Sequence, residues 1–156
     1  MLGKRSWVLY LFVVAVIFDT AGCSRGPVIP KTVAVRGKVV YKDQPLADAE
    51  IGFVGKLDNK DVLAARGMTN AVGEFTLSTY IDPQHEVSGS TPGDYAVTVT
   101  KMEKKDMAQI MQEFKDNPAM TFEQLVPEKY TDAKATPLTA TVSLDGENVF
   151  DFKLED

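Results

Sequence analysis

Apolar and polar residues alternate through most of the chain after residue 32, and this alternation limits the fold more than any other feature. A period of two places apolar side chains on one face of a β-strand, so each alternating run predicts a strand with one buried face. The runs cover residues 33–41, 49–53, 65–69, 75–79, 95–100, 138–144 and 150–154. About seven strands with turn residues between them predict a mainly β fold, an antiparallel β-sandwich of two sheets.

Turn residues predict how the runs are connected. Asp43-Gln44-Pro45 ends the first run, and two prolines and two glycines predict a loop over 82–94. Asp145-Gly146 is a typical hairpin dipeptide, so the last two runs are expected to pair as a closing hairpin over 138–154.

One segment has a helical period instead of a strand period. Its apolar residues follow the i, i+3, i+4, i+7 spacing of an amphipathic helix, with charged residues and Gln between them. These residues are Met107, Ile110, Met111 and Phe114. The spacing predicts a helix over 102–115 that ends at Asn117-Pro118, and a capping pattern predicts a short helical turn over 121–125. Both lie in an insertion at 102–129.

The apolar stripe of this insertion has two interpretations. It packs on the sandwich, as most such stripes do, or its Met-rich side chains form a pliable surface for a partner protein. Burial of the stripe in the monomer would exclude the partner.

The first 22 residues have the parts of a secretory signal peptide in the right order. Lys4 and Arg5 precede an apolar run over 7–18, and small residues then lead to Cys23. The run is too short to cross a bilayer core, which needs roughly 20 apolar residues. The order of parts favours export and cleavage over a permanent membrane helix.

Ala21-Gly22-Cys23 resembles the lipobox of bacterial lipoproteins, although Thr20 stands where that family usually has Leu. The resemblance implies that Cys23 is the lipid attachment site and the mature N-terminus, with acyl chains that tether the protein to a bacterial membrane. The alternative is an ordinary buried thiol. In some bacteria an Asp directly after the lipidated Cys signals inner-membrane retention. This chain has Ser24 at that position, so the resemblance favours the outer membrane of the cell envelope.

These features divide the chain into a signal peptide at 1–22, a lipid-anchored tether at 23–32 and a folded domain at 33–156. Removing the signal peptide takes away Lys4, Arg5 and Asp19, so the 17 basic and 22 acidic residues become 15 and 21, a net charge of −6. An acidic domain does not favour nucleic acid, which is bound by clustered Lys and Arg. One Cys also allows no internal disulfide.

Four segments of the domain resemble carboxypeptidase regulatory-like domains, which share a transthyretin-like sandwich related in architecture to Ig-like domains. They are 35–53, the G-x-T-N-x-x-G-x-F turn at 67–75, the P-G-x-Y-x-V-x-V strand at 92–99, and Val-Pro-Glu-Lys-Tyr at 126–130. The resemblance implies a non-catalytic accessory or binding module.

Few residues offer catalytic chemistry. His85 is the only His, and Ser88 and Ser90 near it lack the Gly-x-Ser-x-Gly elbow of a nucleophilic serine. His85 is therefore expected to be a solvated loop residue. One His cannot complete a four-ligand zinc site. The hydrolases that share the transthyretin-like fold need several His and Arg residues, so we expect no enzymatic activity and no cofactor.

Two acidic loops offer oxygen ligands of the kind that calcium prefers. They hold Asp58, Asn59 and Asp61, and Asp145, Glu147 and Asn148. Neither spacing matches a dedicated calcium loop, and Asp and Asn also favour turns by bonding their own backbone. The second interpretation is preferred, and we expect no metal.

Two functions fit these observations. The first is a membrane-tethered, non-catalytic cell-envelope lipoprotein that acts as a structural or protein-interaction module with an envelope protein as partner. The second is an accessory lipoprotein that captures a carbohydrate, peptide or cation. An aromatic-lined cleft around Tyr80 and Tyr130 would favour the second.

Overall fold

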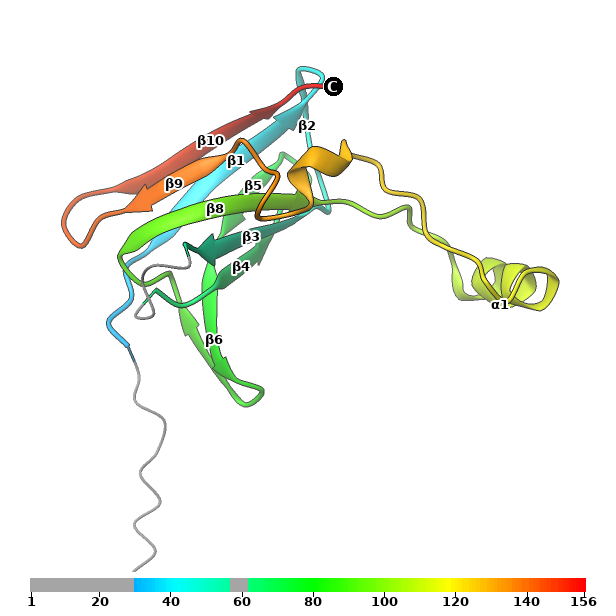
Figure 1. Cartoon of the computed structure of the whole chain (residues 1–156), viewed down its shortest axis with the longest axis horizontal. Helices are drawn as coiled ribbons and strands as arrows, with labels where there is room; N and C mark the ends of the chain where they lie inside the picture. Colours follow the sequence, from blue (N-terminus) through cyan, green and yellow to red (C-terminus); the bar gives the residue numbers. More distant parts are fainter. Residues whose placement is uncertain (1–29, 57–61) are drawn as a thin grey trace, which may run out of the picture.

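The computed structural model describes residues 30–56 and 62–156 as two β-sheets that face each other, with one α-helix that lies away from both (Figure 1). The strands are β1 (Val35–Tyr41), β2 (Gln44–Pro45), β3 (Glu50–Gly55), β4 (Ala65–Met68), β5 (Glu74–Thr76), β6 (Ser78–Asp82), β7 (His85–Ser88), β8 (Gly93–Thr100), β9 (Thr139–Val142) and β10 (Asn148–Leu154). The helices are α1 (Met107–Asp116) and the 3-10 helix η1 (Glu128–Tyr130). The predicted β-sandwich is confirmed, with ten strands in the described residues instead of about seven.

The two sheets differ in size. The larger has the strand order β7-β6-β4-β3-β8-β9, and the smaller has β10-β1-β2, with β5 also paired to β1. All pairs are antiparallel except β1 and β10, which run parallel over seven residues from Val35–Asn148 to Tyr41–Leu154. The prediction of a wholly antiparallel sandwich is therefore wrong for this one pair.

The predicted strand at 75–79 is divided between the sheets at Leu77. Phe75 pairs with Gly37 in the smaller sheet, whereas Thr79 pairs with Ala65 in the larger one. The alternation continues through the crossing because the inner faces of both sheets meet the same core.

The predicted closing hairpin is wrong in its pairing. β9 pairs with β8 in the larger sheet, and β10 pairs with β1 in the smaller one. The connection between them is a crossover, in which the Asn148 side chain bonds the backbone N–H and C=O of Ser143. Alternation indicates which side chains are buried, but it does not indicate which strand lies alongside.

Two segments that the sequence predicted as irregular form strands. The predicted loop at 82–94 contains β7, which pairs with β6 at the edge of the larger sheet. The break after the first strand is a tight turn at Lys42 and Asp43, both with positive φ, after which β2 returns along β1.

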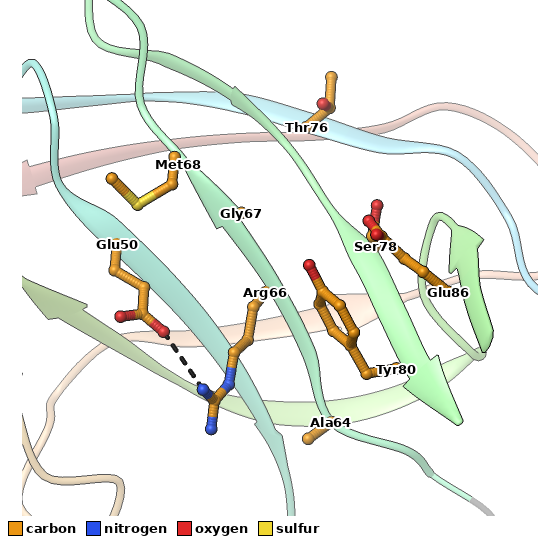
Figure 2. Close-up of a pocket in the computed structure, with 9 residues that line it drawn as sticks. All are labelled: Glu50, Ala64, Arg66, Gly67, Met68, Thr76, Ser78, Tyr80 and Glu86. Atoms are coloured by element: carbon orange, nitrogen blue, oxygen red, sulfur yellow. Dashed lines mark ion pairs between the residues drawn. The ribbon is translucent and has the colours of Figure 1, made fainter. Parts of the chain in front are cut away.

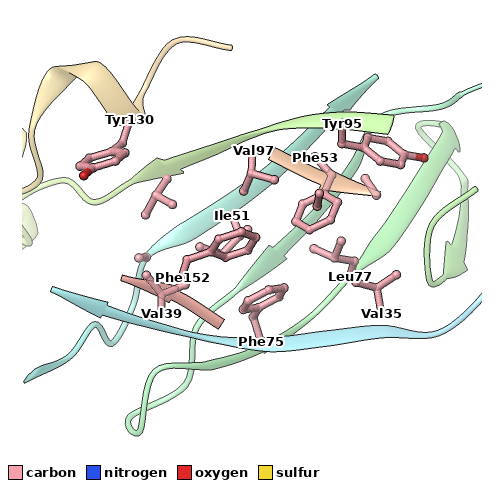
Figure 3. Packing of buried hydrophobic residues seen from close by; sticks show 14 of the residues in the cluster. Val35, Val39, Ile51, Phe53, Phe75, Leu77, Tyr95, Val97, Tyr130 and Phe152 are labelled. Atoms are coloured by element: carbon pink, nitrogen blue, oxygen red, sulfur yellow. The ribbon is translucent and has the colours of Figure 1, made fainter. Parts of the chain in front are cut away.

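The core is filled by side chains from both sheets, with Phe53 of β3 at its centre (Figure 3). Its ring lies 5.5 Å from that of Tyr95, 5.7 Å from Phe150, 6.2 Å from Phe152 and 6.4 Å from Phe75, measured between centroids. Aromatic side chains bury more area than other residues, so this cluster supplies much of the apolar burial that stabilises the sandwich.

One glycine is required within the smaller sheet, where β1 lies between β10 and β5. A Cβ at Gly37 would lie 1.9 Å from the carbonyl oxygen of Phe150 and 2.8 Å from the Phe75 ring. Only a residue without a side chain fits at this close approach of the backbone.

Candidate functional site

The helix α1 forms the tip of an arm made of residues 101–126, between β8 and η1 (Figure 1). The two legs of the arm run antiparallel: Glu103 N–H donates to the Glu123 carbonyl at 2.9 Å, and Leu125 N–H donates to the Lys101 carbonyl at 2.8 Å. The predicted helix at 102–115 therefore begins later, at Met107, because residues 101–103 belong to one leg. The predicted helical turn at 121–125 is wrong, because these residues include the returning leg.

Local side-chain contacts define the helix within the arm. Asp106 is the N-cap and forms a reciprocal capping box with Gln109. The Lys105 ammonium lies 2.6 Å from Glu113 of the helix and 3.4 Å from Glu103 of the first leg. The hydrogen bond to Glu113 is the main cause of the raised pKa of Lys105. Lys105 thus ties the helix to its own stalk.

The apolar stripe of the helix is exposed, and α1 has no buried residue. Met107 is 72% exposed, Met111 55% and Phe114 56%. The legs add Met102, Phe122 and Leu125 to the exposed apolar side chains. The stripe does not pack on the sandwich, so the more common of the two interpretations is wrong for this helix.

The arm leaves the sandwich at the end opposite to the point where the chain enters it. Val33 pairs with Ser90, three residues before the start of β8, and the arm begins after Thr100 at the end of β8. The eight residues of β8 span about 26 Å. Chain entry and arm are therefore separated by the length of the sandwich.

A second feature is a groove of about 640 Å³ on the outer face of the larger sheet (Figure 2). Its lining residues are Glu50, Ala64, Arg66, Gly67, Met68, Thr76, Ser78, Tyr80 and Glu86. Arg66 lies 3.5 Å from Glu50, and both side chains are about half exposed or more. Tyr80 is 56% exposed and pairs across strands with Glu86.

Of these residues, the sequence pointed only to Tyr80. Most of the others are outward-facing positions of β3, β4 and β6, where polar residues are the normal condition of a sheet surface, and Glu86 lies in β7, which the sequence did not predict as a strand. One signal was available, since Tyr80 and Met68 are large apolar side chains at positions where alternation places polar ones.

Tyr80 and Tyr130 do not form the cleft that the sequence suggested. Tyr130 is buried, and its hydroxyl donates to the Glu155 carbonyl and accepts from the Glu155 N–H, both at 3.0 Å. Tyr80 lies on the outer face of the larger sheet. The role of Tyr130 is to hold the end of β10.

The last residue is held in a clasp next to this contact. The Tyr41 hydroxyl donates to the Asp156 carboxylate at 2.6 Å, and the Lys42 ammonium lies 3.1 Å from the same group. The hydrogen bond from Tyr41, followed by the contact with Lys42, lowers the pKa of Asp156.

His85 lies at the tip of the β6–β7 hairpin, where its Nδ1 is 2.8 Å from the Asp82 carboxylate. The backbone N–H of Gln84, and then His85, lower the pKa of Asp82. Both side chains are partly solvated, as expected for His85, but His85 is the first residue of β7 and not a loop residue. Ser90 is fully buried and its hydroxyl donates to Tyr95 Oη at 2.9 Å.

The side-chain oxygens of the acidic turn at 145–148 do not converge on a common point. Glu147 faces Arg36 at 3.5 Å, and the Asn148 amide is used by Ser143. Within residues 30–56 and 62–156, no group of three or more His, Cys, Asp or Glu side chains is arranged to hold a metal ion. The other predicted cluster, Asp58, Asn59 and Asp61, lies outside the described residues, as does Cys23.

In the part of the chain that the structure describes, no helix is both long enough and apolar enough to span a membrane. Comparisons with protein-family models, with curated proteins and with solved structures find no match for this chain. The class of the molecule is thus defined by its own geometry: a two-sheet β-sandwich that carries a projecting helical arm.

Proposed function

We propose that this protein is a membrane-tethered, non-catalytic lipoprotein of the bacterial cell envelope, and that it binds a partner protein through the arm. The observation that carries the proposal is the exposed apolar face of α1, where Met107, Met111 and Phe114 are each more than half exposed. Contiguous exposed apolar surface on a soluble domain commonly marks an interaction site. The capping box and the Lys105 contacts stabilise the helix locally, within the arm itself.

The partner chemistry follows from the charge of the arm. Residues 101–126 hold four Lys and five Asp or Glu, so the arm lacks the excess of basic residues by which interfacial helices bind anionic lipid. An apolar stripe with i, i+3, i+4, i+7 anchors suits a hydrophobic groove on another protein. The two methionines of the stripe let it adapt to the groove, because their side chains are flexible and polarisable.

The position of the arm agrees with this proposal. A tether attached through acylated Cys23 enters the sandwich beside Ser90, while the arm starts at the far end of β8. The arm is thus at the end of the sandwich that lies away from the chain entry, where the tether does not block access of a partner protein. Attachment to the outer membrane and the resemblance to lipoproteins with carboxypeptidase regulatory-like domains are parts of the same proposal.

The anchor is tested by replacing Cys23. The full-length C23A variant should move from the membrane fraction to the soluble fraction after export, because the acyl chains are its only proposed attachment. Labelling with an alkyne analogue of palmitate should mark the wild-type protein and not the variant. Membrane fractionation of exported C23A equal to that of wild type contradicts the lipid anchor.

The arm is tested by purifying the full chain from detergent-solubilised membranes. The variant M111D/F114D should lose a near-stoichiometric protein partner that the wild type retains, because two carboxylates cannot be buried in an apolar groove without a large cost. The matched control is L144D/V149D, which places the same two charges at exposed apolar residues outside the arm. Equal recovery of the partner with M111D/F114D and with wild type overturns the proposal.

A further inference from the structure

We propose that the groove on the outer face of the larger sheet is a binding site for a neutral oligosaccharide, independent of the arm. The groove lies over β3, β4, β6 and β7, whereas the arm leaves the end of β8 (Figures 1 and 2). The two sites are therefore built from different elements and are separable by mutation.

The strand register places the groove residues in adjacent rows. Arg66 pairs with Ser78, and the short Ser78 side chain leaves space beside the guanidinium. Tyr80 pairs with Glu86 in the next row, and Glu50 pairs with Met68 in the row on the other side. The result is a shallow trough with Tyr80 along one side and Met68 along the other (Figure 2).

The charge of the groove distinguishes between classes of ligand. One guanidinium, from Arg66, stands among the two carboxylates of Glu50 and Glu86. An anion would meet both carboxylates, and a cation would meet an arginine already beside Glu50. A neutral ligand avoids both conflicts.

The polar groups of the groove match hydroxyls. The Arg66 guanidinium has five N–H donors. Among the described residues, its ion pair with Glu50 involves only Nη1, so its other donors are available to a ligand. The two carboxylates accept hydrogen bonds, and the Ser78 and Tyr80 hydroxyls do both. A sugar presents neighbouring hydroxyls that donate and accept in turn, which this mixture satisfies.

The exposed ring supplies the apolar contact. Tyr80 offers a flat apolar face beside these polar groups, and the C–H face of a pyranose ring can stack on such a surface. Two other hollows, of about 630 and 520 Å³, have no exposed aromatic side chain in their lining. The volume of about 640 Å³ lies in the usual range for ligand sites, and the open shape suits a chain of sugars better than a single one.

The test is calorimetric titration of the lipidated full chain in a detergent without a sugar head group. Cellohexaose, chitohexaose and maltohexaose are the probes. At least one should bind, and Y80A should weaken that binding about tenfold by removing the stacking surface. Y80F keeps the ring and should retain most of the affinity. R66Q provides a second variant that does not remove the ring and should also weaken binding.

Circular dichroism of each variant checks that it is folded. F114A on the arm should bind the oligosaccharide as wild type does, which separates this inference from the proposed function. Failure of all three probes to bind at 10 mM, or equal binding by wild type, Y80A and R66Q, overturns the proposal. Tighter binding of inorganic phosphate or of hexalysine than of every saccharide overturns the assigned ligand class.

Discussion

The sandwich buries its large apolar side chains, whereas the arm exposes them to solvent. In the sandwich, Phe53 is fully buried at the centre of four other aromatic rings. In the arm, Phe114 is 56% exposed on a helix whose contacts are mainly local. The same residue type therefore stabilises the fold in one region and is left available in the other. In the proposed function, the sandwich is the scaffold and the arm is the element that binds the partner.

The largest effect on stability is expected at the centre of the sandwich. F53A should lower the free energy of unfolding by about 3–5 kcal/mol, because it removes a buried ring and leaves a cavity between the sheets. Chemical denaturation with urea measures this change. A loss below about 1 kcal/mol would show that the aromatic cluster is not the main source of stability.

A smaller effect is expected for the buried hydroxyl of Tyr95. Its Oη bonds Ser90 Oγ at 2.9 Å and the Thr91 carbonyl at 2.6 Å, in a part of the core from which water is excluded. Y95F should cost about 1–3 kcal/mol, because these buried partners lose a hydrogen bond. Urea denaturation beside F53A gives the comparison. Unchanged stability would mean that Ser90 and Thr91 satisfy each other without Tyr95.

A still smaller, pH-dependent effect is expected at the C-terminal clasp. The pKa of Asp156 is lowered by Tyr41 and Lys42. The ionised carboxylate therefore stabilises the fold at pH values above the ordinary pKa of an aspartate, which is about 4. This contribution is lost as the pH falls below that value and through the lowered pKa of the folded state. D156N should lower Tm at pH 7, and the difference from wild type should disappear near pH 2. Thermal unfolding across this range is the measurement. A difference that grows on acidification contradicts the sign.

The smallest effect on stability is expected on the arm. F114A should change the free energy of unfolding by less than about 0.5 kcal/mol, because the ring is exposed and contributes little to the fold. This result, set against F53A, separates a surface residue from a core residue of the same type. A loss comparable to that of F53A would mean that the helix packs on the sandwich in solution.

The sequence was sufficient to predict the buried faces, but it did not reveal how the strands are partnered. Val35, Val39, Ile51 and Phe53 alternate and are buried as predicted. Leu77 and the turn after Val142 pass from one sheet to the other without any change in alternation, because both inner faces meet one core. β7 gave no signal because it is an edge strand without a buried residue.

The candidate sites were predicted less completely. The period of Met107, Ile110, Met111 and Phe114 predicted an amphipathic helix, but no period states what covers the apolar face. The groove depends on outward residues of four neighbouring strands, and their juxtaposition requires the register of β3, β4, β6 and β7. Tyr80 and Met68 at outward positions were its only trace in the sequence.

The most direct test of the arm is photo-crosslinking in intact cells. A photo-reactive amino acid at position 114 of the full-length protein should give one discrete adduct with another protein, and the same amino acid at position 149 on β10 should not give that adduct. Mass spectrometry of the adduct identifies the partner. Crosslinking of position 114 only to lipid or to the protein's own sandwich, or the same adduct from both positions, would contradict the account of the arm as a docking element.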